Sequence, residues 1–148
     1  MQSKNNMVLD ILSLPENLSF ARVTVAAFAS QLDFTLNDLE EIKVVVSEAV
    51  GNAIIHGYSG SGGKRVRISV TLYPNTAEIM VEDTGRGIED IPGAMVPAFS
   101  TDPERMGLGF TFMKSFTEDL KVESTPGLGT RVTMVKKPSL AARNRVAQ

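Results

Sequence analysis

The stretch SEAVGNAIIHG, residues 47–57, decides the fold and also indicates a ligand site. Apolar residues recur before and within it at the 3.6-residue spacing of a helix that buries one face: Ile42, Val45, Val46, Ala49 and Ala53. Glu48 and Asn52 are four residues apart, so they lie one above the other beside this stripe. A carboxylate and an amide at a core margin cost free energy unless they bind a ligand or have partners. The alternative is a solvated Glu beside an Asn that the helix tolerates.

Gly51 adds to this pattern, because a glycine inside a helix costs about 1 kcal/mol relative to alanine. Its presence suggests that another group packs or binds close by. Thr35 and Asp38 have the spacing of a capping box and predict where this helix begins, and Gly57 predicts where it ends.

The neighbouring segments predict an α+β fold. We expect a strand over residues 8–14, a helix from residue 19 to about 32, a hairpin of residues 66–72 and 77–81, a short helix over 107–116, and a last hairpin of 120–123 and 130–135. Residues 84–106 lack periodicity and predict a long irregular loop, a kind of segment that often carries function. The order predicts a two-layer sandwich with helices on one face of a mixed β-sheet. We expect one domain over residues 1–138 and a flexible tail over 139–148.

The composition excludes several classes of protein. Lys and Arg number 15 against 17 Asp and Glu, and the net charge of −2 argues against direct nucleic-acid binding through phosphate contacts. The chain has no cysteine, which excludes disulfides and thiolate metal sites and fits a reducing compartment. The longest apolar run, residues 25–29, is too short to span a membrane. We therefore expect a cytoplasmic protein.

Two glycine-rich segments follow the predicted helix of residues 35–56. Asp83, Gly85 and Gly87 stand at the end of a predicted strand, where the glycines let the backbone approach a flat ligand and the carboxylate can accept from an exocyclic amine. An ordinary tight turn is the alternative. Residues 107–109, Gly-Leu-Gly, open a helix whose N-terminal N–H groups suit phosphate. Arg105, just upstream, either contacts a phosphate or is solvated.

In this order along one chain, the three segments resemble the motifs of the GHKL ATPase and kinase superfamily, whose ATP-binding domain is called the Bergerat fold. The N box corresponds to Glu48 and Asn52, the first glycine box to residues 83–87, and the second to residues 107–109. Residues 20–28 and 45–58 are similar, more closely, to the sporulation anti-sigma F factors. This resemblance runs from about residue 19 to 135.

The resemblance implies a role for each matching residue at a site for ATP or ADP with Mg²⁺. Asn52 would supply an amide oxygen to the metal, and Glu48 would act as the catalytic base. Asp83 would read adenine with Thr130 nearby.

Four glycines and two further side chains receive roles from the same resemblance. Gly85 and Gly87 would shape the adenine pocket, while Gly107, Leu108 and Gly109 would receive phosphate under a lid of roughly residues 93–106. Arg105 would be a cation of that lid. Arg22 matches a position associated with partner docking.

For function, the resemblance implies a homodimeric serine kinase that is also a sigma-factor inhibitor. Its partners would be a sporulation sigma factor of the sigma F type and an anti-anti-sigma protein with a STAS domain, which carries the phosphorylated serine. The lid departs from the family pattern because Asp102 and Glu104 make it shorter and more acidic. A nucleotide-gated binding module with little catalysis is therefore the alternative.

Two other GHKL classes fit less well. A histidine kinase catalytic domain acts on a phosphoacceptor histidine on a separate dimerising helix, and His56 is the single histidine here. We interpret His56 as a helix-end residue near the core. A hydrolase of the mismatch-repair or chaperone type carries large additional domains.

Overall fold

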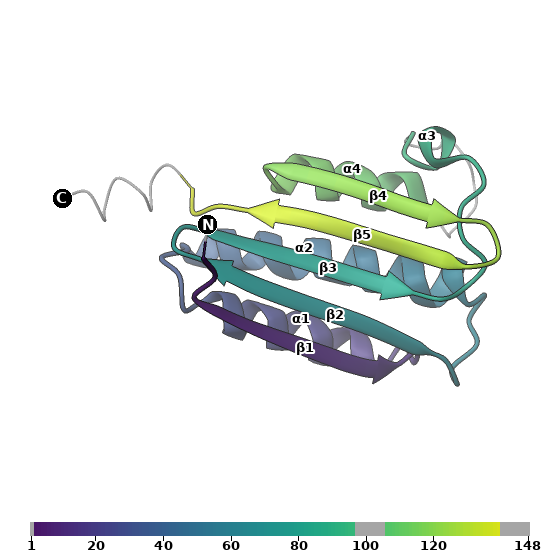
Figure 1. Ribbon diagram of the computed structural model, residues 1–148, viewed down its shortest axis with the longest axis horizontal. Coiled ribbons are helices and arrows are strands. Elements are labelled where there is room, and N and C mark those ends of the chain that lie inside the picture. The colour runs from purple at the N-terminus through teal and green to yellow at the C-terminus, as the bar shows by residue number, and fades with distance from the viewer. Residues whose placement is uncertain (1, 97–105, 140–148) are drawn as a thin grey trace.

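The computed structural model describes residues 2–96 and 106–139, which form a sheet covered on one face by helices (Figure 1). The elements in chain order are β1 (Asn5–Leu12), α1 (Asn17–Ala29), α2 (Leu36–Asn52), η1 (Ala53–Gly57), β2 (Arg65–Tyr73), β3 (Thr76–Asp83), α3 (Ile91–Ala94), α4 (Met106–Phe116), β4 (Asp119–Thr125) and β5 (Gly129–Lys136). The predicted α+β two-layer sandwich with helices on one face is confirmed. Arg105 and most of the predicted lid lie outside the described residues, as does the tail from residue 140.

The five strands have the order β1-β2-β3-β5-β4, and all four neighbouring pairs are antiparallel. The expectation of a mixed sheet was therefore wrong in this detail. The reason lies in the connections: two helices, α1 and α2, join β1 to β2, so the chain reverses three times and β2 runs against β1. The segment with α4 and β4 between β3 and β5 has the same effect.

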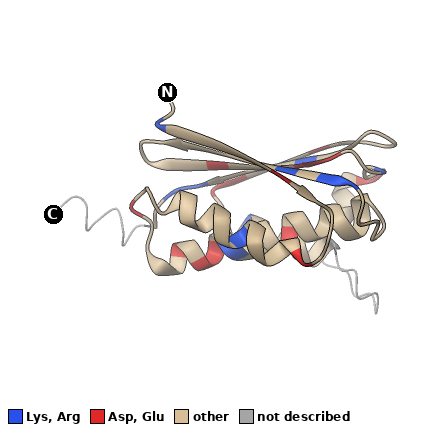
Figure 2. Cartoon of the chain, turned by 90° about the horizontal axis from the view of Figure 1, so that it is seen from below, with Lys and Arg blue, Asp and Glu red and all other residues tan. Residues whose placement is uncertain are grey.

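The core lies between the sheet and the helices, as the view along the sheet shows (Figure 2). Strands β2 and β3 alternate between buried and more exposed residues, which is the period of two expected for a sheet covered on one face. Residues that are at most 3% exposed include Ile42, Val45, Val46, Ala49, Val66, Ile68, Val70, Ile79, Val81, Phe110, Met113, Val132 and Met134. The predicted stripe of α2 is therefore the face that packs on the sheet.

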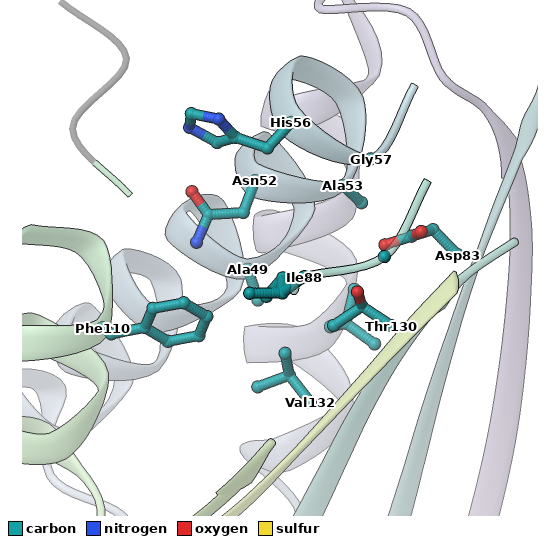
Figure 3. Close-up of a pocket in the computed structure, with 12 residues that line it drawn as sticks. Ala49, Asn52, Ala53, His56, Gly57, Asp83, Ile88, Phe110, Thr130 and Val132 are labelled. Atoms are coloured by element: carbon teal, nitrogen blue, oxygen red, sulfur yellow. The ribbon is translucent and has the colours of Figure 1, made fainter. Parts of the chain in front are cut away.

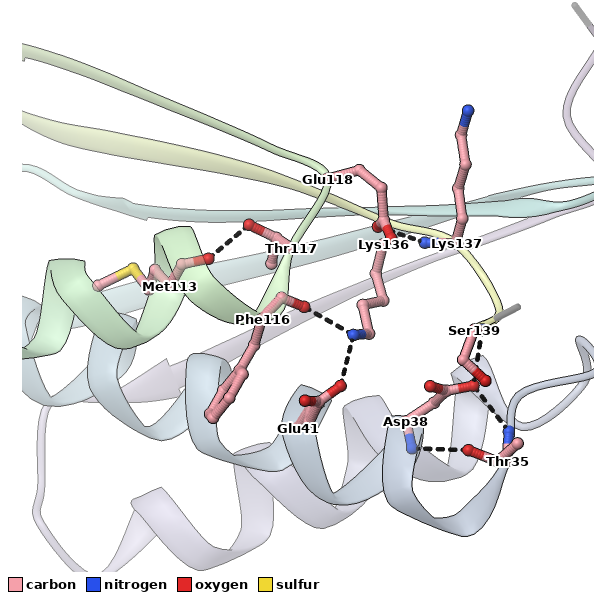
Figure 4. A network of polar contacts seen from close by, with 10 residues as sticks. All are labelled: Thr35, Asp38, Glu41, Met113, Phe116, Thr117, Glu118, Lys136, Lys137 and Ser139. Atoms are coloured by element: carbon pink, nitrogen blue, oxygen red, sulfur yellow. Dashed lines mark hydrogen bonds and ion pairs between the residues drawn. The ribbon is translucent and has the colours of Figure 1, made fainter. Parts of the chain in front are cut away.

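Helix α2 begins as the sequence predicts. The Thr35 hydroxyl accepts from the Asp38 N–H at 3.0 Å, and the Asp38 carboxylate accepts from the Thr35 N–H at 2.9 Å. The same carboxylate accepts from the Ser139 N–H at 3.1 Å, so it also fixes the segment after β5 to the start of α2 (Figure 4).

The other end of α2 differs from the predicted regular helix to residue 56. Residues Ala53–Gly57 form a π-helical turn, closed by a hydrogen bond from the Tyr58 N–H to the Ala53 carbonyl. Single π turns occur often at functional sites, and this one directly follows Asn52. A second difference is the four-residue helix α3 inside the segment expected to be irregular, where the Asp90 carboxylate accepts from the Gly93 N–H.

Candidate nucleotide-binding site

A pocket lies between the end of α2, the start of α4 and the ends of β3 and β5 (Figure 3). It encloses about 370 Å³ when the open solvent at its mouth is included. Its walls are mostly apolar, and they are formed by Ala49, Ala53, Val81, Ile88, Phe110 and Val132. Asn52, His56, Asp83 and Thr130 add polar groups. A mostly apolar pocket with a few polar groups is typical of a site for a small organic ligand.

Asp83 lies at the polar end of this pocket, on the last residue of β3. Gly57 makes room for its carboxylate, since a β-carbon at Gly57 would lie 2.9 Å from Asp83 Cγ. Burial raises the pKa of Asp83, and the N–H groups of Gly85 and Thr130 that donate to it oppose this shift. A carboxylate in such surroundings gains from a ligand that brings a hydrogen-bond donor.

The first glycine box passes between two other parts of the chain. A β-carbon at Gly85 would collide with the Gly57 carbonyl, and the Arg86 N–H donates to the same carbonyl at 2.9 Å. Gly87 has a φ of +76°, and a β-carbon there would collide with the Thr125 carbonyl. Both glycines are therefore required because other parts of the chain's own backbone come close to them. The predicted close approach of this loop to a flat ligand stays a prediction.

Glu48 and Asn52 lie on α2 against the second glycine box. A β-carbon at Gly109 would lie 2.7 Å from Glu48 Oε2 and 3.5 Å from Asn52 Nδ2. Gly107 is similarly restricted, because a β-carbon there would collide with the Val96 carbonyl. Leu108, between them, is 36% exposed. The backbone of α4 thus approaches both polar side chains of the N box.

Each of these two side chains has a feature that favours a ligand. Burial raises the pKa of Glu48. The Asn52 Nδ2 atom is buried and has no hydrogen-bond partner among the described residues. Buried polar atoms are nearly always hydrogen-bonded, so an orphan in a pocket indicates a partner from outside the chain. A rotation of the amide exchanges Nδ2 and Oδ1, and Asn52 can therefore present either a donor or a metal-binding oxygen.

Arg22 lies outside the pocket, on α1. Its Nη1 donates to Ser47 Oγ at 3.5 Å, next in sequence to Glu48.

The structure brings together Glu48, Asn52 and Gly109 at one end of the site, and Asp83, Gly85, Gly87 and Thr130 at the other.

Sequence reasoning missed two kinds of residue at this site. One is the apolar wall, in which Ile88, Phe110 and Val132 take part. The other is Tyr58, which is 8% exposed and whose hydroxyl accepts from the Thr84 N–H at 2.8 Å while it donates to the Arg65 carbonyl. The alternation of buried and more exposed residues along β5 is a signal that could have placed Val132 on the inner face, but no local pattern marks the role of Tyr58.

Comparison with known proteins agrees with this geometry. A family model described as the histidine kinase-like ATPase domain matches residues 11–136. A histidine kinase domain from Erythrobacter litoralis shares the fold, with a TM-score of 0.56 and 20% identity over 85% of this chain and 63% of that one. A structure of RsbU and RsbW domains from Mycobacterium tuberculosis has a TM-score of 0.64 and 16% identity over 92% of this chain and 33% of that one.

The more specific match is in sequence. Anti-sigma F factors of Bacillus licheniformis and Bacillus subtilis are 50% and 49% identical to this chain, and each alignment covers 90% of this chain and 92% of the relative. The anti-sigma F factor of Clostridium acetobutylicum is 50% identical over 93% of this chain and 96% of its own length. The chain belongs to the anti-sigma F factor family of histidine kinase-like ATPases. None of its described helices is long and apolar enough to cross a membrane.

Proposed function

We propose that this chain is a cytoplasmic, single-domain anti-sigma factor that inhibits a sporulation sigma factor and phosphorylates a serine of an anti-anti-sigma protein with MgATP. The observation that carries the proposal is the position of Glu48 and Asn52 against Gly109, beside a mostly apolar pocket whose polar end holds Asp83. The names of the relatives support a sigma factor as partner. The anti-anti-sigma partner is part of what the resemblance of residues 20–28 and 45–58 to the anti-sigma F factors implies.

In this proposal the adenine base lies between the apolar walls and donates its exocyclic amine to Asp83. The phosphates extend towards Gly107, Leu108 and Gly109 and towards Asn52, whose orphaned amide gains a partner. Among residues 2–96 and 106–139, no cluster of three His, Cys, Asp or Glu could hold a metal. Asn52 would therefore share the Mg²⁺ with phosphate and water oxygens, which suits this cation. When bound, Mg²⁺ would neutralise phosphate charge.

Glu48 is the base of the proposed transfer. Its carboxylate would accept the proton of the serine hydroxyl while the serine oxygen bonds to the γ-phosphorus and ADP leaves. The raised pKa of Glu48 makes it a stronger base than an exposed glutamate, and a base is most effective with a pKa close to the working pH. Arg22, whose Nη1 donates to Ser47 next to Glu48, would contact the incoming protein.

The test is transfer of labelled γ-phosphate from MgATP to the anti-anti-sigma protein of the same genome, with the site mapped by mass spectrometry. We expect label on one serine, and we expect Glu48→Gln to bind MgATP but to lose transfer. Arg22→Ala should weaken the complex with the protein partners and leave MgATP affinity unchanged. Sedimentation of the purified chain tests the proposed homodimer.

The sequence of the lid favours a second candidate function. The lid sequence contains Asp102 and Glu104, and an acid next to the γ-phosphate would oppose transfer. A nucleotide-gated module would bind MgATP and the sigma factor but would leave the anti-anti-sigma protein unlabelled. Full labelling that depends on Glu48 would refute this alternative.

A further inference from the structure

Ser124 lies directly behind the polar end of the pocket, although it was not among the predicted site residues. Asp83 pairs with Thr130, and Thr130 pairs with Ser124, so the three side chains form one row across β3, β5 and β4 on the inner face of the sheet. The next row inward is apolar, with Val81 and Val132 opposite each other. The polar row therefore ends the apolar part of the pocket.

The hydroxyl of Ser124 makes three contacts, which fill its hydrogen-bonding capacity. It donates to the Gly129 carbonyl at 3.0 Å and accepts from the Ile88 N–H at 2.7 Å. Its third contact is Thr130 Oγ1 at 2.8 Å. A hydroxyl has one proton and two lone pairs, and a carbonyl can only accept. Because the Ser124 proton goes to Gly129, Thr130 must be the donor in the third contact.

This assignment determines what Thr130 offers to the pocket. With its proton committed to Ser124, the Thr130 oxygen presents only lone pairs to a ligand. The Asp83 carboxylate, when ionised, is also an acceptor only. The two side chains at the polar end thus both require a donor from the ligand.

We propose that Ser124 is a specificity-determining residue that acts by orienting the Thr130 hydroxyl as an acceptor. The site then selects a purine with an amino group at C6, directly or through a bound water, and rejects a purine with a carbonyl there. The proposal rests on the proposed nucleotide function and deepens it. Ser124 is a positioning residue, because it acts on the base through Thr130.

The test compares MgATP with MgITP by calorimetry on the full chain. The two nucleotides share ribose and triphosphate, and their bases differ only at one edge, where inosine has a carbonyl at C6 in place of the amino group and a hydrogen on N1. Contributions of the phosphates therefore cancel in the ratio of their affinities. We expect the unmodified chain to prefer ATP. Ser124→Ala frees the Thr130 proton to rotate into the pocket, and the preference should fall roughly threefold to tenfold, the range of one net hydrogen bond.

Two variants serve as controls. Ser124→Thr keeps the hydroxyl in a strand and should keep the preference. Ser69 lies on the outer face of the sheet, because its neighbours in β2, Ile68 and Val70, are buried on the inner face; it pairs with Met80. Ser69→Ala should therefore change neither the ATP affinity nor the ITP affinity. A merely structural role of Ser124 would lower both affinities in proportion and leave the ratio unchanged, and this result would overturn the proposal.

If Ser124→Ala does not fold, Thr130→Val tests the same hydroxyl directly. It should lower ATP affinity more than ITP affinity, and an unchanged ratio would again overturn the proposal. An unmodified chain that binds both nucleotides equally would refute the specificity and leave nucleotide binding intact. A chain that binds neither would refute the proposed function itself.

Discussion

Replacing Lys136 by methionine should destabilise the protein without affecting its nucleotide pocket. Lys136 is 5% exposed, and its Nζ contacts Glu41 Oε1 at 2.8 Å and the Phe116 carbonyl at 2.6 Å (Figure 4). It thereby joins the end of β5 to α2 and to the end of α4. Methionine fills a similar volume but satisfies neither oxygen.

The magnitude follows from what the substitution leaves behind. Removing one partner of a fully buried ion pair costs about 3–5 kcal/mol. The side chain of Glu41 is 26% exposed, so water reaches the orphaned carboxylate in part. We therefore expect Lys136→Met to lower the free energy of unfolding by about 2–3 kcal/mol, which corresponds to roughly 10 °C in Tm for a chain of this size.

Urea denaturation measures the change, with Lys137→Met as the matched control. Lys137 is the exposed neighbour; its backbone N–H donates to Glu118, and its side chain makes no hydrogen bond or ion pair with the described residues. The double variant Lys136→Met with Glu41→Met should recover part of the loss, because it removes the orphaned charge. MgATP affinity should not change, because Lys136 lies far from the pocket. On β5 it is six residues from Thr130, or roughly 20 Å along the strand, and it pairs with Ala77 at the other end of β3. A loss below about 0.5 kcal/mol would refute this prediction, because Lys136 and Glu41 would then contribute no more than a surface ion pair does.

Three further predictions concern α2. Asn52→Ala should abolish Mg²⁺-dependent ATP binding in calorimetry. It should leave the Tm of the ligand-free protein equal or higher, because it removes a buried nitrogen that has no partner among residues 2–96 and 106–139. Retained tight MgATP binding would show that Asn52 is not the metal ligand. Burial raises the pKa of Asp38, but hydrogen bonds from Ser139 and Thr35 and the charge of Lys136 outweigh it, so the pKa lies below its usual 3.8. Its ionised carboxylate therefore stabilises the fold above pH 3.8, and this stabilisation is lost as the pH falls through the lowered pKa. Asp38→Asn should lower the free energy of unfolding by about 1–2 kcal/mol at pH 7 and by progressively less in acid. A loss that does not depend on pH would contradict this prediction. For Glu48 the pH dependence of stability has the opposite sign, because stability is lost as the pH rises through its raised pKa. Glu48→Gln should therefore raise the Tm at pH 7 but not below about pH 4.5, the usual pKa of a glutamate. An unchanged Tm at pH 7 would count against the burial of Glu48 as the cause.

Much of the fold could be predicted because short-range patterns determine it. The Thr35 and Asp38 capping box needs only four residues, and the structure contains both of its hydrogen bonds. The alternation in β2 and β3 likewise placed their buried faces correctly. The two hairpins were predicted with the correct antiparallel pairing. The direction in which β1 pairs with β2 and β3 with β5 was missed, because it depends on how many elements each connection contains and not on any local pattern.

The site divides in the same way. Glycine spacing marked the loop at Gly85 and the start of α4 at Gly109, where a close approach restricts the room for a β-carbon. The residues that orient the site from behind, Tyr58 and Ser124, belong to elements that meet only after folding. A hydroxyl in a helix end or a strand has many ordinary uses, so its role appears only when the partners of its proton and lone pairs are known.

The two ends of α2 differ in how well their polar groups are satisfied. At its start, the Asp38 carboxylate accepts from two N–H groups, and Glu41 one turn later pairs with Lys136. At its end, Glu48 is partly buried with a raised pKa, and the buried nitrogen of Asn52 has no hydrogen-bond partner in the described part of the chain, just before the π turn. The first group of contacts stabilises the helix in the absence of any ligand, whereas the second lowers stability until a ligand binds. Because the same helix carries both, the well-satisfied start can hold the end in the geometry that a nucleotide requires, and nucleotide binding should then raise the stability of the whole chain by satisfying Asn52.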